Sequence, residues 1–91
     1  MVDSLMHVRI PDPLRSYTAG AAVVSAEAAT LSELVWELDH QYPGLRFRII
    51  DEQGNIRRHI KFFINGQQTR DLGPSLRGGD EVMIVCALSG G

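Results

Sequence analysis

The last apolar segment, residues 81–88, most constrains the fold because it is apolar on both faces. Side chains of a β-strand alternate between the two faces of its sheet. One face would carry Val82, Ile84, Cys86 and Leu88, and the other Met83, Val85 and Ala87. Such a strand is either central in a sheet that is covered on both sides, or covered once by the helix and once by a partner protein. Since the sequence has one clear helix, the second arrangement is favoured.

That helix is predicted over residues 30–42. Thr30 and Glu33 form a capping box, in which the Thr30 hydroxyl accepts from the Glu33 amide and the Glu33 carboxylate accepts from the Thr30 amide. Apolar residues then recur at helical spacing in a single stripe, made of Leu31, Leu34, Val35, Leu38 and Tyr42. Pro43 and Gly44 end the helix. Trp36 lies beside the stripe, where we expect it to cover the edge of the core.

Strands are predicted on both sides of the helix. Residues 5–10 alternate between apolar and polar side chains, and residues 21–26 could return beside them as an antiparallel hairpin. Residues 60–64 form a strand, the following Asn65-Gly66 favours a type I′ turn, and residues 67–70 form the short return strand. Residues 45–59 fit either a helix or a short strand followed by a loop.

Size and composition limit the function classes. The chain has 91 residues, of which 44% are hydrophobic and 22% charged, so residues 1–91 form a single domain with one core. A core of this size leaves little depth for an enclosed catalytic pocket, which argues against an autonomous enzyme. The net charge of −2 argues against nucleic-acid binding. A single cysteine and the lack of a long apolar stretch predict a cytoplasmic protein without a disulfide or membrane span.

The chain ends in Gly90 and Gly91. Glycine at both positions removes every side-chain atom next to the terminal carboxylate, so a flexible tail of about residues 88–91 could enter a passage too narrow for other residues. Frayed glycines at a chain end are the alternative explanation.

The predicted elements follow the order of the β-grasp, or ubiquitin-like, fold. This is an α+β fold with a mixed sheet of four to five strands packed on one main helix. Three segments resemble the MoaD/ThiS family of small sulfur-carrier proteins, and the resemblance covers the whole chain: Phe63-Ile64-Asn65-Gly66, Gly79-Asp80-Glu81-Val82 and Ala87-Leu88-Ser89-Gly90-Gly91. The length of the chain and its long 45–59 segment are most similar to the CysO-like branch.

The resemblance implies a protein cosubstrate rather than an enzyme. An ATP-dependent activating enzyme of the ubiquitin-activating type would adenylate the Gly91 carboxylate, and sulfide or a persulfide would convert it to a thiocarboxylate. The thiocarboxylate would then donate sulfur to an enzyme that makes a cofactor, cysteine or another sulfur-containing metabolite. The chain itself would bind no cofactor. Gly90, Ser89 and Leu88 are implied to thread into the activating enzyme, and a metallopeptidase is a further candidate partner.

Reversible docking on the activating enzyme requires an exposed surface. The outward residues Phe63, Met83 and Val85 form a candidate apolar patch, flanked by the charges of Lys61 and Arg9. We expect this patch to be the docking face.

Other chemistries have weaker support. Cys86 shares a face with Val82 and Ile84, so we expect it to be a small, inert core residue rather than a persulfide relay. His7, His40 and His59 have no metal-ligand spacing, and no metal site is predicted. Two alternatives to the sulfur carrier stay open. The chain could be a ubiquitin-like modifier joined to lysine through Gly91, or a non-covalent β-grasp interaction domain.

Overall fold

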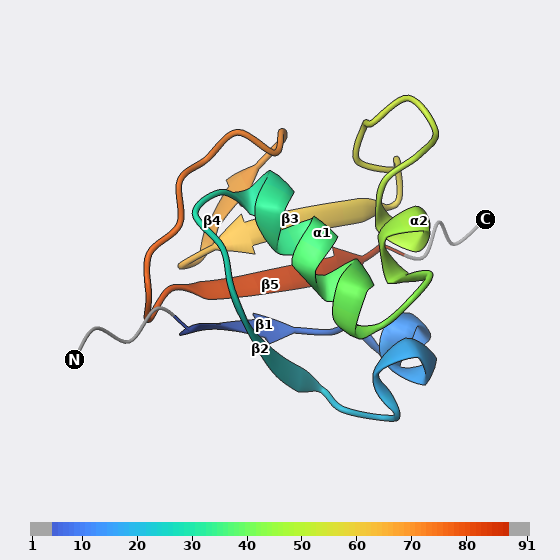
Figure 1. Cartoon of the computed structure of the whole chain (residues 1–91). Coiled ribbons are helices and arrows are strands. Elements are labelled where there is room, and N and C mark those ends of the chain that lie inside the picture. Colours follow the sequence, from blue (N-terminus) through green and yellow to red (C-terminus); the bar gives the residue numbers. More distant parts are fainter. Residues whose placement is uncertain (1–4, 88–91) are drawn as a thin grey trace.

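The computed structural model describes residues 5–87, in which a five-stranded mixed sheet packs against one main helix (Figure 1). The strands are β1 (Leu5–Arg9), β2 (Val23–Glu27), β3 (Ile60–Ile64), β4 (Gln67–Thr69) and β5 (Glu81–Cys86). The helices are the 3₁₀ helix η1 (Asp12–Thr18), α1 (Leu31–Gln41) and α2 (Leu45–Ile49). The arrangement is the predicted β-grasp fold.

The strand that is apolar on both faces is central in the sheet. The strand order is β2-β1-β5-β3-β4, in which β5 runs parallel to β1 and antiparallel to β3. The strand ends at Cys86, earlier than predicted, and Ala87 follows it outside the ladder. Leu88 lies outside the described residues.

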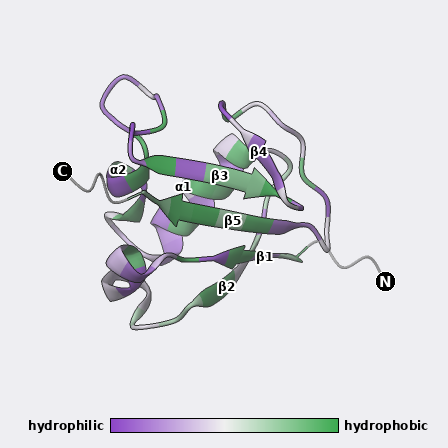
Figure 2. Ribbon diagram, turned by 180° about the vertical axis from the view of Figure 1, so that it is seen from behind, coloured by the Kyte–Doolittle hydropathy of each residue, from purple (hydrophilic) through white to green (hydrophobic). Residues whose placement is uncertain are grey.

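The core lies between α1 and one face of the sheet. The predicted stripe of α1 is buried at Leu31, Leu34, Val35 and Leu38, and Tyr42 packs against its end. The sheet contributes buried side chains from its four longer strands, among them Met6, Val24, Phe62, Val82 and Ile84. Figure 2 shows the sheet from the side away from α1, and the β5 ribbon has the colour of hydrophobic residues along most of its length. None of the described helices is long and apolar enough to cross a membrane.

The start of α1 is capped by its own side chains and by a distant loop. Thr30 Oγ1 accepts from the Glu33 amide at 3.2 Å, as predicted. The Glu33 carboxylate accepts from the Ala29 amide at 3.0 Å, one residue before the predicted donor. The amides of the first turn donate to the carbonyls of Pro74 and Leu72, so the 72–76 segment holds this helix end against the sheet.

Two connecting segments contain short helices. Residues 45–59, which fitted a helix or a strand, form the short helix α2 and then a loop closed by a bridge between Ile50 and Ile56. Gly44, with φ of +97°, separates α1 from α2. The 3₁₀ helix η1 connects β1 to β2, and the antiparallel hairpin is confirmed although β2 spans Val23–Glu27 rather than 21–26.

The turn between β3 and β4 has the predicted type I′ character. Asn65 and Gly66 both have positive φ, of 49° and 86°. The return strand β4 ends at Thr69, one residue earlier than predicted.

Candidate functional site

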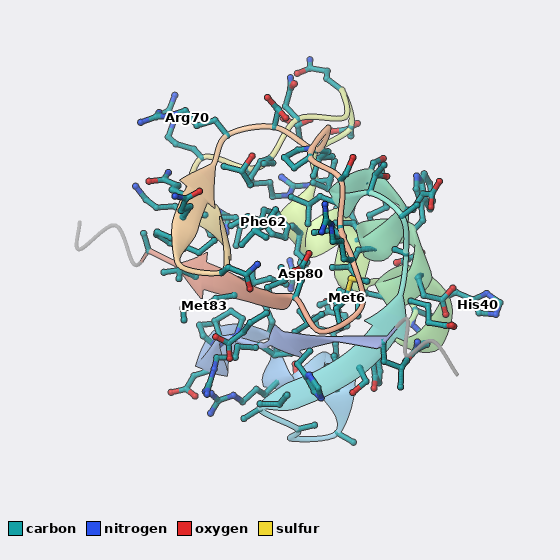
Figure 3. The ribbon with its side chains drawn as sticks, turned by 90° about the vertical axis from the view of Figure 1, so that its left-hand side faces the viewer. Met6, His40, Phe62, Arg70, Asp80 and Met83 are labelled. Carbon is teal, nitrogen blue, oxygen red and sulfur yellow. The ribbon has the colours of Figure 1, made fainter. Side chains whose placement is uncertain are left out.

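The five residues predicted for docking lie together on the face of the sheet opposite α1. Phe63 on β3 is directly opposite Met83 on β5, and Arg9 on β1 is opposite Met83 on the other side. Lys61 is opposite Val85 in the next row of the same ladder. Met83 is 37% exposed and points away from the helix layer (Figure 3). The sheet therefore aligns these residues in two rows. Phe63 and Met83 form one row, which ends in Arg9, and Val85 lies beside Lys61 in the other.

The charges beside these rows are available to solvent and to a partner. Arg9 Nε lies 3.4 Å from the Glu81 carboxylate, and both side chains are more than half exposed, at 56% and 54%. A pair this exposed contributes little to stability, so Arg9 can exchange Glu81 for a partner's carboxylate at low cost. Lys61 is exposed and has no ion pair within residues 5–87.

The path of the chain beyond β5 starts at a fixed point. The Ala87 amide donates to the His59 carbonyl at 2.7 Å, which ties the residue after β5 to the segment before β3. The predicted tail residues Leu88, Ser89, Gly90 and Gly91 lie outside the described residues. Their proposed roles stay predictions.

Cys86 lies on the predicted face but is only half-buried. The core ends beside it, and one side of Cys86 borders a groove of about 380 Å³, which we call the tail-base groove. The groove is lined by Pro13, Leu14, Phe47, Arg48, Glu52, Arg57, His59 and Cys86. Cys86 is therefore a boundary residue, not a fully enclosed core residue.

Trp36 does not cover the edge of the core. Its side chain is 55% exposed, and the guanidinium carbon of Arg46 lies 3.8 Å from the centre of its ring. The prediction was wrong because the indole packs against Arg46 instead of against the core. The turn between α1 and α2 brings Arg46 close to Trp36.

The histidines are dispersed. His7 is on β1, His59 precedes β3, and His40 projects from the end of α1 far from the sheet (Figure 3). Within residues 5–87, no three side chains of His, Cys, Asp or Glu are placed to hold a metal ion.

One polar network was missed at the sequence level. Asn65 Nδ2 donates to Asp80 Oδ1 at 3.0 Å, and Asn65 Oδ1 accepts from the Glu81 amide at 3.0 Å. The Asn65 side chain and the Arg77 amide, which donates to the other Asp80 oxygen at 2.8 Å, lower the pKa of the Asp80 carboxyl. The network joins the β3–β4 turn to the start of β5. Asn65 belongs to one family-like motif, residues 63–66, and Asp80 to another, residues 79–82. Nothing in the sequence shows that these two motifs meet.

The arginines of the tail-base groove were also missed. Arg48 belongs to α2 and Arg57 to the loop after it, a region whose structure the sequence left open. Each guanidinium is fixed by one aromatic residue, Tyr17 for Arg48 and Phe47 for Arg57.

Comparisons with known proteins agree with this geometry. The ThiS family model matches residues 8–91. The chain is 33% identical to the sulfur carrier protein CysO of Mycobacterium tuberculosis, over 92% of this chain and 96% of that protein. The crystal structure of that CysO has a TM-score of 0.87 at 31% identity, covering 91% of this chain and 99% of the other.

Two further solved structures are similar over nearly the whole chain. A chain in the BexX/CysO complex of Amycolatopsis orientalis has a TM-score of 0.88 at 29% identity, covering 94% of this chain and 99% of that one. SAMP1 of Haloferax volcanii, a small archaeal modifier protein, has a TM-score of 0.82 at 27% identity, with coverages of 96% and 99%. The family predicted from the sequence motifs is thereby confirmed: this chain belongs to the ThiS family, in its CysO-like branch.

Proposed function

We propose that this chain is a sulfur carrier whose reactive group is the Gly91 carboxylate. The observation that carries the proposal is the match to curated sulfur carriers over 92% of the chain, together with a family match that continues to Gly91. The carrier is a cosubstrate of partner enzymes, and its own residues provide docking and presentation rather than catalysis.

The chemistry needs activation because a carboxylate is a poor electrophile. In the activating enzyme, a Gly91 oxygen attacks the α-phosphorus of ATP and pyrophosphate leaves. Sulfide then attacks the acyl carbon, AMP leaves, and Gly91 ends in a thiocarboxylate. Donation of the sulfur to an acceptor enzyme, with water supplying the replacement oxygen, regenerates the carboxylate. Gly90, Ser89 and Leu88 connect this group to the domain, and glycine at position 90 keeps the approach narrow.

Docking uses the sheet face formed by Phe63, Met83, Val85, Lys61 and Arg9. Half-buried apolar side chains with a charged rim suit an interface that forms and dissociates in each cycle. The substitution Val85→Asp places a charge in the apolar rows and lowers affinity for the activating enzyme. Leu5→Asp is the matched control because Leu5 is exposed at the other end of β1, where it pairs with Glu27 and with none of the docking residues. Equal affinities of the two variants would remove this face from the proposal.

A second function is favoured by the likeness to a small archaeal modifier protein. The same activated Gly91 would then be joined to a lysine amine. Removing Gly90 and Gly91 separates both covalent functions from a non-covalent interaction domain, because only the last retains activity. Lysine adducts on other proteins, in cells that also produce the activating enzyme, would support the modifier.

The partners are an adenylating enzyme that uses ATP and a downstream sulfur-accepting enzyme, with a metallopeptidase as a further candidate. A related CysO has been solved in a complex with BexX, which supports docking of such a carrier on a partner protein. The proposed location is the cytoplasm, where ATP and thiols are available.

A further inference from the structure

The tail-base groove lies where the chain leaves the sheet. It is bordered by η1, α2, the 51–59 loop and Cys86 at the end of β5. Figure 1 shows α2 and this loop beside the end of β5. Any protein that receives the tail must therefore come close to the groove, which lies apart from the rows around Met83.

Arg57 is held in the groove with part of its guanidinium unused. Its Nε donates to the Phe47 carbonyl at 2.7 Å, and its guanidinium carbon lies 4.6 Å from the centre of the Phe47 ring. The Arg57 amide also donates to the Ile49 carbonyl, which fixes the backbone. Within residues 5–87, the terminal nitrogens of Arg57 have no acceptor. Phe47 itself is 56% exposed, so a partner could reach both the ring and the cation.

Arg48, on α2, is also held by one hydrogen bond from its Nε. Its Nε donates to the Tyr17 hydroxyl at 2.8 Å, and its guanidinium carbon lies 5.9 Å from the centre of the Tyr17 ring. Its terminal nitrogens also have no acceptor in the described part of the chain. Two guanidinium groups in one groove are thus ordered by the protein before any ligand binds. Ordering them beforehand reduces the entropy lost on binding.

The charge around the groove is unbalanced. Glu52 is the only acidic residue among its described lining residues, against the two arginines Arg48 and Arg57. The neighbouring surface beside Ala87 adds Arg58 and Lys61. This concentration of cations occurs in a chain whose net charge is −2, so it is a local feature of the tail end.

The chemistry of the groove fits carboxylates on a protein segment. A guanidinium whose Nε is occupied and whose face is stacked still offers its outer edge to a carboxylate. The Phe47 ring and Pro13 add apolar walls, which suit a peptide that carries apolar side chains between its acids better than a bare phosphate.

From this geometry we infer that the tail-base groove binds an acidic segment of the activating enzyme, with Arg48 and Arg57 each pairing with a carboxylate. The inference rests on the proposed function for the identity of the partner. It adds a second contact, on the helix side of the tail, to the docking face on the sheet. With one contact on the docking face and another in the tail-base groove, the activating enzyme would fix the direction in which the tail enters it.

The test measures the affinity of the carrier for the activating enzyme by calorimetry without ATP, so that no chemistry is needed. Arg57→Glu and Arg48→Glu should each weaken binding about tenfold or more. Arg46→Glu is the matched control, because Arg46 is on the same helix and stacks on Trp36 but does not line the groove. It should stay within about twofold of the original protein. Arg57→Lys keeps the positive charge but loses the planar guanidinium that can bind both oxygens of a carboxylate. Its affinity should lie between those of Arg57→Glu and the Arg46→Glu control.

Several outcomes would overturn the inference. Equal losses in the Arg46, Arg48 and Arg57 variants would show a response to net charge alone, and unchanged affinity in folded Arg48 and Arg57 variants would show that the groove is not used. If removal of residues 88–91 shifted the Arg48 and Arg57 side-chain NMR signals in the free protein, the occupant would be the chain's own tail. Mass spectrometry of the unaltered carrier tests the proposed function separately. Tight binding with no gain of sulfur would reject the sulfur chemistry and leave the groove measurement valid.

Discussion

Phe63 and Met83 lie directly opposite each other across the β3–β5 ladder, on the sheet face away from α1. Side chains opposite each other in an antiparallel pair touch and act as a unit. Arg9 extends the row on β1 and Lys61 flanks it on β3. The pair is therefore the centre of the proposed docking face.

Alanine at either position should weaken docking on the activating enzyme by about tenfold, because each removes an anchor of the interface. The double substitution Phe63→Ala with Met83→Ala should cost less than the sum of the two, since each single change already disrupts the pair. Calorimetry on the four proteins gives the coupling. Additive effects would show that the two side chains do not act together.

The Asn65–Asp80 contact predicts a pH-dependent term in stability. The pKa of Asp80 is lowered in the folded protein, so the charged carboxylate is favoured by folding. The stability that the charged Asp80 carboxylate contributes is fully present above the ordinary pKa of an aspartate. It is lost as the pH falls through the lower pKa that Asp80 has in the folded protein. The substitution Asp80→Asn should cost about 1 kcal/mol at neutral pH, because the site is partly exposed.

Urea unfolding of both proteins from neutral to strongly acidic pH measures this term. The difference between them should shrink once Asp80 is protonated. A difference that is the same at every pH would mean that the carboxylate charge does not matter.

The core and the exposed face of α1 should respond differently to truncation. Leu34→Ala creates a cavity under the sheet and should cost about 2 to 5 kcal/mol of unfolding free energy. Trp36→Ala removes an exposed stack on Arg46 and should cost less than about 1 kcal/mol. Thermal and urea unfolding report both values. A large loss from Trp36→Ala would restore a structural role for the indole.

Elements set by local chemistry could be predicted from the sequence. The two-sided β5, the capped α1 and the Asn65-Gly66 turn each depend on neighbouring residues, and the structure confirms all three. The helices η1 and α2 could not be placed, because five to seven residues are too few to show a period. The tail-base groove depends on contacts between distant segments, such as Arg48 with Tyr17, 31 residues apart. The five residues of the proposed docking face could be assigned to one face of the sheet because side chains alternate along a strand.

Cys86 should not be needed for sulfur transfer, since its parity and packing against the core make it mainly a structural residue. The substitution Cys86→Ser should leave the rate of thiocarboxylate formation within about twofold of the original protein. Single-turnover kinetics with intact-mass detection measure the rate. A loss of sulfur transfer in a variant that still docks with unchanged affinity would instead support a persulfide relay beside the tail.

The central claim is that Gly91 carries the sulfur, and intact-mass spectrometry tests it most directly. The carrier is incubated with its activating enzyme, ATP and sulfide, and the modified residue is located by fragmentation. A variant lacking Gly90 and Gly91 and a reaction without ATP are the controls. We expect an ATP-dependent exchange of one oxygen for sulfur at Gly91 and no change in either control. An unchanged mass with an active enzyme, or adducts on lysine in place of the exchange, would contradict the account.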